Sequence, residues 1–173
     1  MAKKIGILSG ILLFVLSFFA VLPLGIYFNG GISSYAEIPL YIINYNGISA
    51  YFWGTINTST STAAWWIDLG ASGTLALITV QLMILLACIV TFISSWSKTN
   101  RGKLGFMVSL IMMFVALVVI ILDLFLSGAY LGIGTVVPAA DLLTALGIGF
   151  YIFIISIVLN ILCVRAFAKT EED

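Results

Sequence analysis

The stretch Ile38–Trp53 reads IPLYIINYNGISAYFW, and at its centre Asn46-Gly47 lies between two runs rich in Ile, Tyr and Phe. Asn and Gly both tolerate positive φ, as a two-residue type I′ turn requires, and the flanking residues favour strands. The spacing predicts a β-hairpin with three facing pairs: Tyr45–Ile48, Ile43–Ala50 and Tyr41–Phe52. Both faces of this hairpin would be largely apolar, so it should lie against an apolar surface. An irregular loop with a chance Asn-Gly is the alternative.

The rest of the chain has the composition of a membrane protein. Of 173 residues, 62% are hydrophobic and 8% are charged, whereas soluble domains carry about a quarter charged residues. Four apolar segments are each long enough, at about 1.5 Å per residue, to cross a hydrocarbon core of about 30 Å. We therefore expect an all-α integral membrane fold, a four-transmembrane-helix bundle with a small extracellular β-hairpin or sheet from the first outer loop. The expected single domain covers residues 1–173, with spans at about 5–27, 72–96, 104–126 and 142–164, outer loops at 28–71 and 127–141, and a connector at 97–103.

The first apolar segment has a second interpretation. Lys3 and Lys4 ahead of an apolar run could begin a signal peptide. The run is longer than the hydrophobic region of a signal peptide and lacks a clear small-residue cleavage site. We therefore expect a retained first helix, in which Gly6 and Gly10 have a GxxxG spacing that permits close helix approach.

The positive charges predict the orientation. All the basic residues fall on one side of a four-span arrangement: Lys3, Lys4, Lys98, Arg101, Lys103, Arg165 and Lys169. Cytoplasmic loops near spans carry the excess of Lys and Arg. We therefore expect a multi-pass cell-membrane protein with both termini and the connector in the cytoplasm and both longer loops outside. Asn57-Thr58-Ser59 is an N-glycosylation sequon, which agrees with an exterior first loop.

The outer loop carries the residues that could bind a partner. Aromatic side chains are good anchors in protein interfaces. The predicted contact surface consists of Tyr41, Tyr45, Tyr51, Phe52 and Trp53. Packing of the same aromatic residues against the membrane end of the chain is the competing interpretation.

Catalytic and cofactor-binding patterns are not found in the sequence. The chain has no histidine, which removes imidazole-ligated metals and the commonest general base. Its two cysteines, Cys88 and Cys163, lie in apolar runs and are most simply packing residues, with acylation of Cys163 as the minor alternative. No phosphate-binding loop, nucleophile elbow or zinc motif occurs. We therefore expect no enzyme activity, no cofactor and no metal. Nucleic acid is not an expected partner, because no basic patch lies outside the membrane flanks.

Polar residues within the spans are the remaining candidates for a site. Gln81 and Asp123 lie in the outer parts of two antiparallel spans and could form an intramembrane polar pair. An interhelical hydrogen bond that fixes packing is the simpler role, and a cation or proton site is the functional one. Asn160, near the inner end of the last span, is expected to hold helices together. Gly147 and Gly149 offer a small face for another helix.

The four-span topology with a long first outer loop resembles the claudin/PMP22-like group of membrane proteins. The matching residues are the hairpin-like stretch Leu40–Trp53 and the run from Gly47 to Trp53-Gly54, where claudins carry a Gly-Leu-Trp motif. The resemblance implies an extracellular β-sheet built mainly from the first loop. It also implies cell-surface contact, lateral assembly or an accessory role beside a larger membrane protein. The cysteine pair of the claudin loop has no counterpart here.

The function expected from these patterns is non-enzymatic and depends on contacts between proteins. The expected partners are membrane lipid and either another membrane protein or a second copy of the chain. A small channel or transporter subunit that uses Asp123 and Gln81 is the alternative.

Overall fold

The structure is a computed structural model that describes residues 2–18, 40–52, 54–57, 62–65, 70–97, 100–126, 138 and 140–169. Its long helices are α1 (Ala2–Phe18), α3 (Gly70–Trp96), α4 (Asn100–Leu126) and α6 (Ile148–Lys169), and α5 (Leu142–Ala145) is a single turn. Segments of α3, α4 and α6 are long and apolar enough to cross a membrane: Thr79–Trp96, Arg101–Leu122 and Ile148–Phe167. These three helices mark the chain as a multi-pass membrane protein.

The predicted hairpin is present and belongs to a larger sheet. Strands β1 (Ile43–Tyr45), β2 (Ile48–Tyr51), β3 (Gly54–Asn57) and β4 (Thr62–Trp65) form an antiparallel meander in the order β1-β2-β3-β4. The turn between β1 and β2 has φ of 50° at Asn46 and 77° at Gly47, as a type I′ turn requires. The pairs Tyr45–Ile48 and Ile43–Ala50 are confirmed.

The third predicted pair, Tyr41–Phe52, is wrong. The ladder ends at Ile43, and the Ile42 N–H donates to the Ala50 carbonyl at 2.7 Å instead of continuing the two-residue alternation. Ile42 and Ile43 are consequently both buried. Phe52 has already entered the turn that leads from β2 to β3. A local bend in the backbone, which periodicity does not encode, therefore separates Tyr41 from Phe52.

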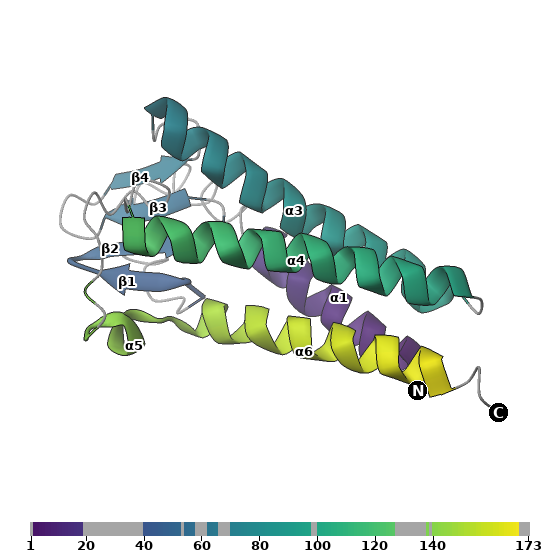
Figure 1. The fold of residues 1–173 in the computed structure, drawn as a ribbon. Coiled ribbons are helices and arrows are strands. Elements are labelled where there is room, and N and C mark those ends of the chain that lie inside the picture. Colours follow the sequence, from purple (N-terminus) through teal and green to yellow (C-terminus); the bar gives the residue numbers. More distant parts are fainter. Residues whose placement is uncertain are drawn as a thin grey trace.

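The long helices form a four-membered ring. Helix α1 packs against α3 and α6, and α4 packs against the same two helices from the other side. The start of α1 and the end of α6 lie at one end of the bundle, together with the connection from α3 to α4 (Figure 1). The sheet lies at the opposite end (Figure 1).

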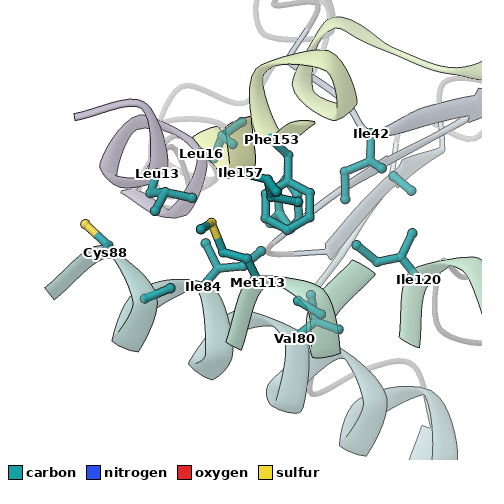
Figure 2. Packing of buried hydrophobic residues seen from close by; sticks show 14 of the residues in the cluster. Leu13, Leu16, Ile42, Val80, Ile84, Cys88, Met113, Ile120, Phe153 and Ile157 are labelled. Atoms are coloured by element: carbon teal, nitrogen blue, oxygen red, sulfur yellow. The ribbon is translucent and has the colours of Figure 1, made fainter. Parts of the chain in front are cut away.

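The core runs along the bundle and continues into the sheet. Side chains from the long helices meet at the centre with Ile42 from the sheet end (Figure 2). The labelled members are Leu13 and Leu16 of α1, Val80, Ile84 and Cys88 of α3, Met113 and Ile120 of α4, and Phe153 and Ile157 of α6. Large apolar side chains also cover the outside of the bundle, such as Ile93 at 67% exposed and Ile111 at 62% exposed. A helix that is apolar on every face is expected where lipid replaces water as the solvent.

The segment expected as one span over 142–164 consists of two helices. Between α5 and α6, Leu146 forms an antiparallel bridge with Ile43, and the Gly147 N–H donates to the Ile42 carbonyl at 2.8 Å. The Gly149 N–H donates to the Tyr41 carbonyl at 3.1 Å. These bonds attach the chain before α6 to the edge of the sheet, so the last long helix begins at Ile148 instead of Leu142.

Glycine is needed at this junction because two backbone segments approach closely. A Cβ atom at Gly147 would collide with the carbonyl oxygen and ring of Tyr41, and one at Gly149 would collide with the carbonyl oxygen of Leu40. The sequence predicts that these glycines face another helix. They face instead the residues that lead into β1.

Candidate functional site

The most extensive polar cluster lies inside the bundle and joins all four long helices. Its side chains are fully buried: Ser9 of α1, Thr91 of α3, Ser109 of α4, and Ser156 and Asn160 of α6. Asn160 is at the centre of this interior polar cluster. Its Nδ2 donates to Ser9 Oγ at 2.8 Å and to the Ser156 carbonyl at 3.2 Å, and its Oδ1 accepts from Thr91 Oγ1 at 3.4 Å.

The other hydroxyl groups complete the cluster. Thr91 donates its hydroxyl proton to Asn160 Oδ1, so the Ser109 hydroxyl proton is shared between Thr91 Oγ1 at 2.7 Å and the Ala87 carbonyl at 3.1 Å. Ser9 Oγ donates to the Ser156 carbonyl at 3.1 Å. Asn160 thus bonds to α1 and across the ring to α3, as expected of a residue that holds helices together. Such bonds are worth about 0.6 kcal/mol each on average in membrane bundles.

Gln81, which the sequence pairs with Asp123, bonds to a different helix. Its Nε2 donates to the Ser17 carbonyl of α1 at 3.2 Å. Within the described part of the chain, Gln81 Oε1 and the buried Ser17 Oγ have no hydrogen-bond partner. The Asp123 side chain lies outside the described residues. The Thr91–Ser109 contact sets the register of α3 and α4, so Gln81 lies at the same level of the bundle as Val119. Asp123 is four residues farther along α4, which places its backbone roughly 6 Å nearer the sheet than Gln81.

An apolar layer separates Gln81 from the interior polar cluster. Leu13, Ile84, Met113 and Ile157 converge between these two levels (Figure 2). Leu13, Ile84 and Met113 are fully buried. The described helices therefore enclose a packed centre with two polar levels and an apolar level between them.

The predicted contact surface is divided between the core and the exterior. Phe52 is 1% exposed, and its ring packs edge-on against Phe153 of α6 with centroids 5.2 Å apart. Tyr51 is buried and packs T-shaped against Tyr41 at 6.5 Å. Burial raises the pKa of the Tyr51 phenol, with a smaller contribution from Tyr41. Phe52 and Tyr51 therefore pack within the chain, which is the alternative role that the sequence left open.

The exposed part of the hairpin is its tip. Asn44 and Asn46 are exposed, whereas Tyr41, Tyr45 and Ile48 are half-buried. Trp53 and the side chain of Asn57 lie outside the described residues.

Leu143 of α5 was not among the predicted site residues. It is 76% exposed at the sheet end, and α5 contacts β1. The sequence placed Leu143 within the last span, where an apolar residue carries no special signal. The exposure of Leu143 beside the hairpin follows from the break between α5 and α6, which the sequence did not predict.

Both cysteines are free and buried. Cys88 Sγ donates to the Gly10 carbonyl at 3.5 Å, and Cys163 is fully buried on α6. These positions favour packing roles. Groups of three or more metal-ligating side chains do not occur among the residues that the structure describes.

Comparisons of the chain with protein-family models, with curated proteins and with solved structures give no match.

Proposed function

We propose that this chain is a non-enzymatic membrane protein that acts through contacts with other proteins. It would serve at the cell surface, in lateral assembly or as an accessory subunit of a larger membrane complex. The observation that carries the proposal is how the polar groups of the bundle are used. The interior polar cluster around Asn160 bonds helix to helix, and the buried Ser94 and Ser95 donate to carbonyl groups of their own helix. Because these polar groups serve helix packing, we place the contacts with other proteins on the outer surface of the molecule.

The proposed contact surface is the hairpin tip together with α5. It contains Tyr45, Asn46, Ile48 and Leu143, with Tyr41 at its base. The tip is held in place from behind, because Ile42, Ile43 and Phe52 are buried in the core. A rigid surface loses less conformational entropy when it binds than a mobile loop does.

The proposed topology has four spans, with α1 as the first. Lys3, Lys4, Arg101 and Arg165 are exposed. They belong to the start of α1, the start of α4 and the last part of α6, and these helix ends lie opposite the sheet (Figure 1). Because basic residues flank spans on the cytoplasmic side, this end is proposed to be cytoplasmic and the sheet extracellular. A four-stranded sheet made from residues 43–65 also supports the proposed kinship with the claudin/PMP22-like group.

Labelling of single cysteines tests the topology. The Cys88→Ala/Cys163→Ala background removes the native thiols, and Asn46→Cys and Arg101→Cys supply one exposed thiol at each end. A membrane-impermeant maleimide should label Cys at 46 in intact cells and Cys at 101 only after permeabilisation. Labelling of both positions from the same side would exclude this topology.

Photo-crosslinking in native membranes tests the function. A photoreactive residue at Asn46 or Leu143 should capture a discrete protein, whereas the same residue at Ile111, on the apolar outside of α4, should capture mainly lipid. Capture of lipid alone at all three positions would count against a role in protein contacts. Capture of the chain itself from positions 46 and 143 would identify lateral assembly.

A channel or transporter subunit is the second candidate, and one observation favours it. Gln81 Oε1 and Ser17 Oγ are buried without partners in the described part of the chain, as in a site that takes a polar ligand. The apolar layer beneath Gln81 argues against a continuous path. In proteoliposomes, this candidate requires an ion flux that Asp123→Asn abolishes without loss of folding, and absence of any flux would reject it.

A further inference from the structure

Three helix ends converge at the basic end of the bundle. A Cβ atom at Gly6 of α1 would collide with Ser95 Oγ of α3 and would lie 2.7 Å from the Phe106 ring of α4. The start of α1, the end of α3 and the start of α4 are therefore in close contact. The charged residues that precede Gly6 and Phe106 lie around this junction.

Positive charge gathers on the outside of this junction. Lys3 Nζ lies 4.2 Å from the centroid of the Trp96 ring. Lys3, Lys4 and Arg101 are all exposed, and Trp96 is 68% exposed. Arg101 is in the first turn of α4, where the helix dipole already favours an anion over a cation.

Acidic side chains do not offset this charge within the described part of the chain. Among the residues whose side chains the structure describes, the one acidic residue is Asp141, which lies beside α5 at the sheet end. An anion held beside the basic side chains would lower their mutual repulsion.

One exposed apolar side chain lies one helical turn from Lys4 and another lies one turn from Trp96, and residues three or four apart lie on the same helix face. Leu8 follows Lys4 on α1 and is 49% exposed. Ile93 precedes Trp96 on α3 and is 67% exposed. Along the helix axis, Leu8 and Ile93 each lie one turn nearer the sheet end than Lys4 and Trp96.

We propose that the junction of α1 and α3 binds an anionic phospholipid. Lys3 and Lys4 contact the headgroup phosphate, Trp96 lies at the level of the headgroup, and Leu8 and Ile93 contact the acyl chains. Arg101 of the neighbouring α4 adds to the positive potential. The combination of cations with apolar side chains one turn deeper matches a lipid and not a free phosphate ion, which has no acyl chains. This inference rests on the bundle lying in a membrane and does not depend on a protein partner.

Quenching of Trp96 fluorescence by brominated lipids tests the proposal. The variant Trp53→Phe/Trp65→Phe/Trp66→Phe leaves Trp96 as the sole tryptophan. Two samples of this variant are prepared in phosphatidylcholine nanodiscs. One contains brominated phosphatidylglycerol, and the other contains the same fraction of brominated phosphatidylcholine. Brominated phosphatidylglycerol should quench Trp96 several-fold more strongly. Equal quenching by the two lipids would overturn the proposal.

The lysines supply the matched variants. Each cation near an anionic surface contributes about 1 kcal/mol, or roughly a fivefold preference. Lys3→Gln/Lys4→Gln should therefore remove most of the preference, and Lys3→Arg/Lys4→Arg should keep it. An unchanged preference in the glutamine variant would overturn the assignment. If that variant does not fold, 1 M salt applied to the parent protein provides the same test, because screening should reduce the preference.

A final arm separates lipid from soluble phosphate. Inorganic phosphate and chloride at equal ionic strength should reduce the preference equally. A stronger effect of phosphate would overturn the assignment to lipid and would indicate a site for a soluble anion.

Discussion

Phe52 illustrates at the scale of one residue how the outer loop is attached to the bundle. Its ring is buried and packs edge-on against Phe153. Phe52→Ala should lower the free energy of unfolding by about 3 kcal/mol, because a large aromatic side chain leaves a cavity when it is removed from a core. Unfolding in mixed micelles with increasing dodecyl sulfate measures this change.

The half-buried Tyr45 is the control for this prediction. Tyr45→Ala should cost clearly less, since less of its surface is removed from solvent. Equal and small losses in the two variants would show that Phe52 is not part of the core. A loss of partner capture in Phe52→Ala with unchanged stability would return Phe52 to the contact surface.

Asn160 is the residue on which the interior polar cluster depends. Asn160→Ala should lower the free energy of unfolding by about 1–2 kcal/mol, because it removes bonds to α1 and α3 and leaves Ser9 and Thr91 with fewer partners. The double variant with Thr91→Val should be less destabilised than the sum of the single variants, since the two residues share a bond. Leu162→Ala, on the lipid-facing side of α6, is the control, and strict additivity would indicate that Asn160 and Thr91 do not interact.

At the scale of an element, the hairpin depends on the conformation of its turn. Gly47 has φ of 77°, which costs an L-residue about 1 kcal/mol. Gly47→Ala should therefore increase hydrogen exchange of the Ile42 amide, which bonds to Ala50, by roughly fivefold. Asn46→Gly should have little effect, because glycine accepts the positive φ of 50° at that position. Protection that is the same in both variants would show that the turn conformation does not limit the hairpin.

At the scale of the whole molecule, the core joins the sheet to the helices without a break. Ile42, Ile43 and Ala50 belong to the same cluster as Leu13 and Met113. The two ends should therefore unfold in one transition. In the cysteine-free background, fluorophores at Asn46→Cys and Lys4→Cys should report the same midpoint in dodecyl sulfate, which is the test of two-state behaviour. Separate midpoints would show that the sheet and the bundle are independent units.

The patterns that the sequence revealed most clearly are those that depend on neighbouring residues. Asn46-Gly47 between apolar runs predicted the turn and the two pairs nearest to it, because turn conformation and side-chain alternation are local. The apolar segments predicted long helices for the same reason. The pairing of Tyr41 with Phe52 failed because the bend at Ile42 has a distant cause. Backbone bonds from Gly147 and Gly149 attach residues 41 and 42 to the start of α6.

The sequence by itself determined that this is a membrane protein, that its hairpin turns at Asn46-Gly47, and that its positive charges lie in a few clusters along the chain. Composition and short-range periodicity are sufficient for these conclusions. Only the tertiary structure decided which aromatic residues are buried, that Gln81 bonds to Ser17, that Asn160 joins helices across the bundle, and that Lys3 lies over Trp96. These depend on which faces of distant segments meet. That choice is made by packing around a shared core, and apolar helices with similar faces on all sides do not reveal it in sequence.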